Sequence, residues 1–308
     1  AFTGATALLR DDGAGACKRY IFNVRASYAQ EAEATMQYFL SRGVNESTRL
    51  ISFDQDDTFG DAGYQGLVAA YTRNIGALPA GVTLPRFRYT KGDAASVEQA
   101  AAGVTALLEA RLAQPGVQKV GILMTDTYAP ATSFIRAIRT WQYADPDRAA
   151  RLQLTLSNVS FVGPNSLATK LKEAGTIPGS SGVPFSQDVV VSQVVPNYQN
   201  DPSDIVSGYR QALSATGATP TFTSLEGYIA ARVFVAGLLA HRGEYSPEAL
   251  VATFERLPAL GQGLGASSGF STSDHNYSRT VWGTALTPDG GFSNLYYWSE
   301  GTPIRFFE

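Results

Sequence analysis

The sequence predicts an α/β fold in which parallel sheets are flanked by helices and divided between two lobes. Short apolar segments alternate with helical segments along residues 20–195, a pattern typical of parallel sheets. Residues 120–124 are apolar throughout, as expected for a strand that is buried on both faces. The length of 308 residues suits two units, each large enough to bury its own core.

The predicted elements follow one another in a regular order. A strand at 20–24 precedes a helix at 29–42, in which apolar residues such as Met36 and Phe39 recur at helical spacing. The same reasoning predicts, in chain order, strand 49–53, helix 63–74, strand 86–89, helix 94–113, strand 120–124, helix 130–139, strand 155–162 and strand 189–195. Each strand but the last two is thus separated from the next by a helix.

The carboxy-terminal third departs from this alternation. Three helices are expected at 204–215, 225–241 and 247–257, with hardly a strand among them. Helices of this kind need a sheet against which to bury their apolar faces, and this part of the sequence supplies none. Two strands, 279–286 and 292–298, close the chain and are joined through Pro288-Asp-Gly-Gly291, a hairpin signal.

Composition excludes several classes of protein. Hydrophobic content of 44% and charged content of 17% are ordinary for a soluble globular chain. The net charge of -3 arises from interspersed acids and bases, so a nucleic-acid partner is not expected. No apolar run reaches the roughly 18 residues of a membrane span, and residues 229–240, broken by Arg232, fit a buried helix.

The few cysteines and histidines limit metal and disulfide chemistry. Cys17 is the only cysteine, which rules out a disulfide within the chain and a cysteine-based metal site. His241 and His275 are the only histidines, too few for a multi-histidine site. We therefore expect no cofactor and no metal. Because the sequence starts without Met or a signal peptide, we also expect a mature, trimmed or fragmentary chain.

An acidic loop at residues 54–60 follows the predicted strand 49–53, where open α/β sheets bind their ligands. The pattern Asp54-x-Asp56-x-Thr58 matches the signature of Mg²⁺-dependent phosphatases that form an aspartyl-phosphate. Alternatively, the acids are a solvated loop, and Phe59 is an aromatic side chain directed into a cleft. No acidic pair follows a later strand, as the phosphatase would need, so the second interpretation is favoured.

A second catalytic pattern is also weak. Residues 265–269 match G-x-S-x-G, with Asp274 and His275 close behind. A nucleophile elbow needs a strand before the serine and a helix after it. Neither is predicted here, and a flexible crossover loop explains the glycines and serines better.

Several tracts, in their order and spacing, resemble the type I periplasmic binding proteins, specifically the leucine/isoleucine/valine-binding-like receptors of ABC importers. The tracts span nearly the whole chain and lie at residues 2–5, 20–26, 56–60, 160–164, 190–196 and 224–231. The resemblance implies a two-lobed fold of parallel sheets with three hinge crossovers. Roughly the first 100 residues of such proteins have no counterpart in this sequence, so we expect the first lobe to be incomplete.

The resemblance also implies how the chain is divided between the lobes. Residues 1–26 and 199–267 correspond to the partial amino-terminal lobe, and residues 27–192 and 279–308 to the carboxy-terminal lobe. Crossovers fall near residues 24–28, at 193–198 and at 268–278. The sheet expected to cover the helices between 204 and 257 belongs to the part of the first lobe that is absent. Unless another chain or a retained fragment covers their apolar face, we expect dimerisation or poor solubility.

The site residues implied by the resemblance come from both lobes. Phe2, Thr3 and Gly4 match the amino-terminal-lobe contact, with backbone donors and the Thr3 hydroxyl meeting a polar head group. On the other lobe three positions match: the aromatic residues Phe59 and Tyr128, and Asn165, where amino-acid binders carry an acid. Tyr28 is a further cleft residue. An amide at position 165 cannot neutralise an ammonium group, so either Asp126 supplies the acid or the ligand is not an α-amino acid.

Taken together, the resemblance implies an extracytoplasmic solute-binding receptor without enzymatic activity. It would capture a small carboxylate or amino-acid-like ligand between two lobes and present it to a membrane ABC permease, from a periplasmic or extracellular location, soluble or lipid-anchored. Ligand contacts to both lobes would shift the population from open to closed. A ligand-sensing module of the same fold is the alternative within this class.

Overall fold

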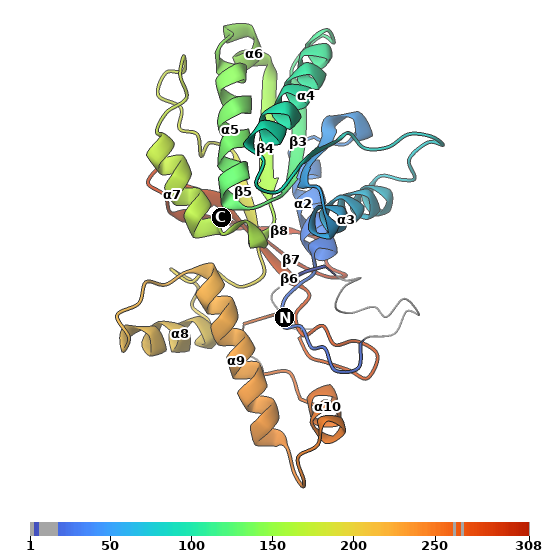
Figure 1. Ribbon diagram of the computed structural model, residues 1–308, viewed down its shortest axis with the longest axis vertical. Coiled ribbons are helices and arrows are strands. Elements are labelled where there is room, and N and C mark those ends of the chain that lie inside the picture. Colours follow the sequence, from blue (N-terminus) through green and yellow to red (C-terminus); the bar gives the residue numbers. More distant parts are fainter. Residues whose placement is uncertain (1–2, 6–17, 261–262, 266–267, 308) are drawn as a thin grey trace.

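A computed structural model describes residues 3–5, 18–260, 263–265 and 268–307. Its centre is an eight-stranded sheet with the order β2-β1-β3-β4-β5-β6-β7-β8 (Figure 1). The strands are β1 (Leu50–Gln55), β2 (Arg86–Tyr89), β3 (Gln118–Thr125), β4 (Leu152–Asn158), β5 (Val189–Gln193), β6 (Thr280–Leu286), β7 (Phe292–Ser299) and β8 (Arg305–Phe306). Strands β1 to β5 pair in parallel and β6 to β8 antiparallel, which confirms the predicted α/β class.

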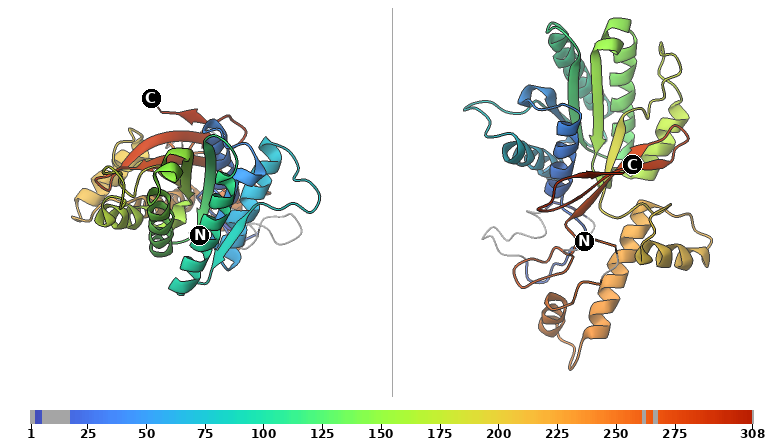
Figure 2. Two further views of the ribbon diagram at one scale, coloured as in Figure 1. Left: turned by 90° about the horizontal axis from the view of Figure 1, so that it is seen from above. Right: turned by 180° about the vertical axis from the view of Figure 1, so that it is seen from behind.

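Helices cover both faces of this sheet (Figure 2). One core cluster joins α2 (Tyr28–Ser41) and α3 (Thr58–Asn74) to residues such as Leu123 and Val190. The other face carries α4 (Ala94–Leu112), α5 (Tyr128–Tyr143), the short α6 (Pro146–Arg151) and α7 (Pro164–Ala174). Because β1, β3 and β4 are parallel, the helices that follow them all begin at one edge of the sheet.

Helix α3 begins five residues earlier than predicted, and its cap explains the difference. The Asp57 side chain accepts hydrogen bonds from the backbone N–H groups of Phe59 and Gly60, at 2.9 and 3.2 Å. Such a cap satisfies N–H groups that the first turn leaves unpaired. The acidic loop is therefore shorter than expected, and Phe59 projects from the first turn of a helix.

Other boundaries also differ from expectation. Residues 20–24 do not form a strand; Asn23 makes a single parallel bridge to Asn276, so this segment is a crossover paired with another crossover. Helix α5 begins at Tyr128 rather than Pro130, and residues Ser160–Val162 are a 3-10 helix rather than the end of β4. Helices α6 and α7, strand β8 and a short 3-10 helix at Ser47–Arg49 were not predicted.

Three helices lie apart from the sheet: α8 (Asp204–Ser214), α9 (Phe222–Ala240) and α10 (Pro247–Glu255). The expectation of a buried helix at residues 229–240 is wrong for the described chain, since only 28% of the most apolar window of α9 is buried. Phe234, Val235 and Leu239 are exposed. By length and composition alone α9 could cross a membrane, with a mean hydropathy of 1.3, but core helices of soluble proteins meet the same criterion.

Candidate functional site

The carboxyl edge of the sheet meets the amino-terminal segment at Tyr28. The backbone N–H of Tyr28 donates to the Gly4 carbonyl at 3.0 Å, and the Asn23 amide donates to the Thr3 carbonyl at 2.8 Å. A Cβ at Gly4 would lie 2.7 Å from the Tyr28 nitrogen and 2.9 Å from its ring. Glycine is therefore required for this close approach. Thr3 and Gly4 thus lie beside Asn23 and Tyr28, whereas Phe2 lies outside the described residues.

Aromatic rings continue from this point along the edge. The Tyr28 and Phe59 ring centroids are 5.2 Å apart, and Phe59 and Phe161 are 5.4 Å apart in an edge-to-face arrangement. Tyr28 is buried, and its hydroxyl has no hydrogen-bond partner among the described residues. Phe161, 46% exposed, was not predicted, although the tract 160–164 contains it. We call Tyr28, Phe59 and Phe161 the aromatic cluster.

Tyr128 stands beside this cluster rather than within it. The ring is 41% exposed and lies against Gly163, where a Cβ would be 3.5 Å from its Cδ1 atom. No ring contact joins it to another aromatic side chain within the described ranges. In this conformation Tyr128 is available at the surface of the edge, at the start of α5.

Asn165 lies in the first turn of α7, and its amide is already engaged. Its Nδ2 donates to the Tyr198 hydroxyl at 2.8 Å, and its Oδ1 accepts from the Phe222 backbone N–H at 3.4 Å. These bonds tie α7 to the second crossover and to the start of α9. A ligand that used this amide would have to displace one of them.

Asp126 is placed beneath the edge rather than on it. The residue is fully buried, its Oδ1 accepts from Asn158 Nδ2 at 2.5 Å, and its Oδ2 has no partner among the described residues. Burial raises the pKa of this carboxyl well above its ordinary value. A buried acid whose surroundings favour its neutral form is a poor substitute counter-charge for an ammonium group.

A buried ionic network that sequence reasoning missed lies at the crossovers. Arg25 Nη2 contacts Glu31 Oε1 at 2.6 Å and also bonds the Ser160 hydroxyl, and Arg25 Nη1 lies 3.5 Å from Glu226 Oε1. Glu31 Oε2 further accepts from the Ser160 N–H at 2.7 Å and the Ser192 hydroxyl at 2.6 Å. We call these five residues the hinge network, since they join the first crossover, α2, the loop after β4, β5 and α9.

Electrostatics in the hinge network follow from burial and pairing. Burial lowers the pKa of the Arg25 guanidinium, but Glu226 and Glu31 outweigh it, so that the pKa lies above its ordinary value. Burial also raises the pKa of Glu226, which Arg25 partly offsets. The signal in the sequence was a lone arginine within an apolar crossover, followed by an acid on the buried face of a helix.

The acidic loop is neutralised by arginines on β2. Asp54 is fully buried and accepts from Arg86 Nη2 at 2.7 Å and from the Ser52 hydroxyl at 2.7 Å. Arg88 pairs with Asp56 at 2.6 Å. An enclosed, ion-paired carboxylate is not positioned to attack phosphorus. Among the described residues no group of three potential ligands could hold a metal, and Ser267 of the G-x-S-x-G pattern lies outside them.

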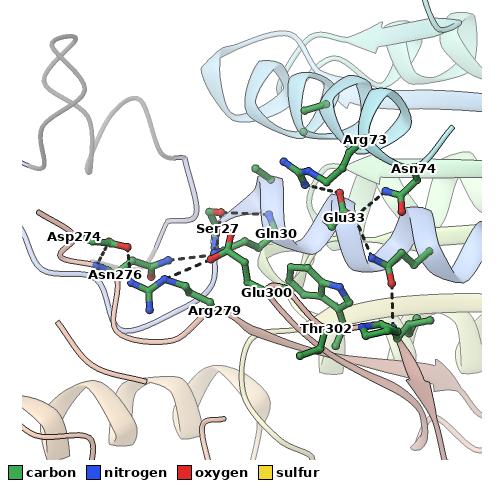
Figure 3. Close-up of a pocket in the computed structure, with 18 of the residues that line it drawn as sticks. Ser27, Gln30, Glu33, Arg73, Asn74, Asp274, Asn276, Arg279, Glu300 and Thr302 are labelled. Carbon is green, nitrogen blue, oxygen red and sulfur yellow. Dashed lines mark hydrogen bonds and ion pairs between the residues drawn. The ribbon is translucent and has the colours of Figure 1, made fainter. Parts of the chain in front are cut away.

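A separate groove of about 1130 Å³ lies between α2, α3 and the segment after β7 (Figure 3). Its polar side chains pair with one another: Glu33 accepts from Arg73 at 2.6 Å and from Asn74 at 2.7 Å, and Arg279 forms an ion pair with Asp274. Of the residues predicted for the ligand site, none that the structure describes lines this groove.

Comparison with known proteins gives a consistent result. A family model described as periplasmic binding protein matches residues 2–291. No curated protein matches the chain. The structure is similar to that of a possible leucine/isoleucine/valine-binding protein from Rhodopirellula baltica SH 1, with a TM-score of 0.73 and 29% sequence identity over 96% of this chain and 69% of that chain.

Two further solved structures show the fold at lower identity. An extracellular ligand-binding receptor from Verminephrobacter eiseniae ef01-2 has a TM-score of 0.63 and 21% identity, covering 91% of this chain and 71% of that chain. A branched chain amino acid ABC transporter from Thermus thermophilus with bound valine has a TM-score of 0.61 and 14% identity, covering 92% and 68%.

Proposed function

The chain belongs to the periplasmic binding protein family, and on that basis we propose that it captures a small ligand at the aromatic cluster for an ABC importer. Family membership makes it a solute-binding protein and implies a periplasmic location. The family binds solutes rather than catalysing reactions. The ligand's chemistry and the importer partnership are the parts that the proposal adds.

The observation that carries the proposal is the hydrogen bond between Tyr28 and Gly4, next to Thr3, together with the ring contact between Tyr28 and Phe59. This contact brings the amino-terminal segment to the carboxyl edge of the sheet, where ligands of open α/β sheets bind. Aromatic rings form an apolar wall, and the Thr3 hydroxyl and neighbouring backbone groups can meet a polar head. Sites of this kind, apolar with few placed polar groups, are typical of small-molecule binding.

We infer that the ligand is a small carboxylate with an apolar or aromatic body, which need not carry an amino group. Asn165 offers a neutral amide where an amino-acid binder offers an acid, and Asp126 is buried beneath the edge. An ammonium group facing only an amide would lack a counter-charge. A planar organic acid would instead use the aromatic rings for its body and the backbone donors for its carboxylate.

The hinge network supports ligand capture by closure. Arg25 on the first crossover contacts Glu226 on α9, so an ion pair next to the site joins the crossover to the helices α8 to α10. A ligand that contacts both sides would bind the closed state more tightly than the open state. The population would shift toward the closed state by that difference in binding free energy. A sensor module of the same fold would use the same closure, with another protein in place of the permease.

The test is a thermal-shift panel on the purified chain. It compares leucine, isoleucine and valine with their 2-keto acids and with benzoate. Binding at one hundred times Kd adds about 2.7 kcal/mol, a readily measured rise in melting temperature. We expect stabilisation by amine-free acids. Stabilisation by the amino acids alone would contradict the ligand class, and no stabilisation by any member would contradict the proposed binding of small carboxylates.

A further inference from the structure

A small polar pocket lies at the end of the sheet far from the crossovers, where α2 and α5 end and where β3 and β4 begin. Its volume is about 320 Å³. The walls contain three cations, Arg42, Lys119 and Arg139, the polar residue Thr155, and one acid, Asp188. Neither the family nor the proposed function assigns a role to this pocket.

Arg139 is the buried cation of the pocket. It is 2% exposed; its Nη1 donates to the Gln142 side chain at 2.9 Å, and its Nη2 donates to the carbonyls of Leu154 and Gln187, at 3.2 and 2.7 Å. Its Nε has no hydrogen-bond partner among the described residues, and no carboxylate of the described chain forms an ion pair with it. A buried charge without a counter-ion is costly, so this guanidinium would gain from an anion.

The other two cations are held at the same pocket. The Lys119 side chain lies over Gly43, where a Cβ would be 3.1 Å from its Nζ atom, and it forms no ion pair with a described carboxylate. Arg42 makes only a long pair with Asp188, at 3.8 Å. Asp188 itself has a φ of 53°, which is uncommon for a residue with a side chain.

The charge balance remains positive after the opposing groups are counted. Asp188 offsets one of the three cations. The carboxyl ends of α2, α5 and the short α6 also lie at this pocket, and each contributes at most roughly half a negative charge. A net positive charge is then left, concentrated in a pocket whose size suits a small polyatomic ion rather than a macromolecule.

We propose that this pocket is a second binding site, separate from the aromatic cluster, for a small multivalent oxyanion such as phosphate, sulfate or a small organic polycarboxylate. Lys119 and Arg42 would contact the oxyanion directly. The Thr155 hydroxyl would donate to it, and Arg139 would supply the buried positive charge beneath it. Guanidinium and ammonium groups with a hydroxyl are donors that suit phosphate and carboxylate oxygens.

The test is calorimetric titration of the chain with phosphate, sulfate and citrate, with sodium chloride of matched ionic strength as the screening control. We expect saturable binding of at least one oxyanion with a Kd below about 1 mM. Lys119→Met should weaken it at least about tenfold, whereas Lys91→Met, an equal loss of charge at an exposed lysine elsewhere, should change Kd less than about twofold. Asp188→Asn should strengthen it, because Asn tolerates the same backbone conformation and removes the competing charge.

Two results would overturn the proposal. One is the absence of saturable binding by the unmodified chain for all three oxyanions. The other is an equal loss of affinity in Lys119→Met and Lys91→Met, which would indicate general attraction to the surface. Phe59→Ala should leave oxyanion binding unchanged, so the result is independent of the ligand proposed for the aromatic cluster.

Discussion

Phe59 connects the two halves of the proposed site at the scale of single residues. Its ring contacts the Tyr28 ring on one side and the Phe161 ring on the other. The backbone of Tyr28 in turn donates a hydrogen bond to the Gly4 carbonyl. The residue is placed by the Asp57 cap, which starts α3 at Thr58 and so sets the direction of the first turn. Because the contacts between Tyr28 and Phe161 run through the Phe59 ring, substitution of Phe59 tests the proposed site directly.

We predict that Phe59→Ala abolishes most of the stabilisation by an amine-free acid that binds in the thermal-shift panel. Truncation of a central aromatic contact typically costs 2 kcal/mol or more of binding free energy, about thirtyfold in Kd. The measurement is the Kd of that acid for the variant. Phe234→Ala on α9, an exposed ring, is the matched control and should not change Kd. Equal affinity in Phe59→Ala and the unmodified chain would remove Phe59 from the site.

Asp126 leads to a prediction about pH. Its pKa is raised by burial, so the folded protein prefers the neutral acid. The contribution of the Asp126 carboxyl to the free energy of unfolding is fully present below its ordinary pKa of 3.8. It is lost as the pH rises through the raised pKa of the folded protein. Asp126→Asn mimics the neutral form, and we expect it to be more stable than the unmodified chain near pH 8 but not near pH 4.

The measurement for this prediction is the free energy of unfolding in urea at both pH values. Asp147→Asn serves as the control because its side chain is 70% exposed. If Asp126→Asn and Asp147→Asn showed the same dependence on pH, the carboxyl of Asp126 would be charged in the folded protein and the account of its environment would be wrong.

At the scale of elements, the packing of α3 on β3 depends on a glycine. A Cβ at Gly63 would lie 1.9 Å from the Thr125 hydroxyl oxygen and 2.8 Å from its Cβ. This close approach lets α3 sit against the strand whose end leads to Asp126. In α9, by contrast, a Cβ at Gly227 would meet nothing within 4 Å.

The two glycines give a matched pair of substitutions. Gly63→Ala should lower the free energy of unfolding by roughly 1–3 kcal/mol, because the added methyl group would overlap Thr125 and push α3 away from β3. Gly227→Ala should raise it by about 0.5–1 kcal/mol, because alanine favours a helix and no neighbour opposes it. Urea denaturation of both variants is the measurement. Stabilisation by Gly63→Ala would contradict the described contact between α3 and β3.

The elements also show what the sequence could and could not reveal. Periodicity located the buried strands and long helices well, because burial on a regular face leaves a regular pattern. It missed the start of α3, which the Asp57 cap sets, and the start of α5, whose first two residues precede Pro130. The network around Arg25 escaped prediction because its members are separated by up to 201 residues in the chain. Asp126 was expected at the site because it follows a predicted strand. Its side chain is buried beneath the edge, and the sequence does not give the direction of a side chain.

At the scale of the whole molecule, the helical part carries an apolar surface that the described residues leave uncovered. Phe234, Val235 and Leu239 on α9 are 54%, 48% and 73% exposed. Contiguous exposed apolar side chains favour association. We predict that this chain self-associates at micromolar concentration through α9.

The measurement is sedimentation velocity over a range of concentrations. Phe234→Glu combined with Leu239→Glu should shift the chain toward the monomer, because the substitutions place charge on the exposed face. Val82→Glu combined with Val117→Glu, at exposed valines outside α9, adds the same charge and should not. A chain that is monomeric without substitution would contradict this role for the apolar face.

The central claim is that the chain is a receptor that retains a small carboxylate between two parts of its structure. Native mass spectrometry of the protein purified from its own source tests this most directly, since it detects a bound molecule without prior choice of ligand. The account predicts a complex that loses one small acidic molecule on denaturation and that Phe59→Ala no longer retains. A chain that carries no small molecule, and that retains none after incubation with the acids of the panel, would contradict it.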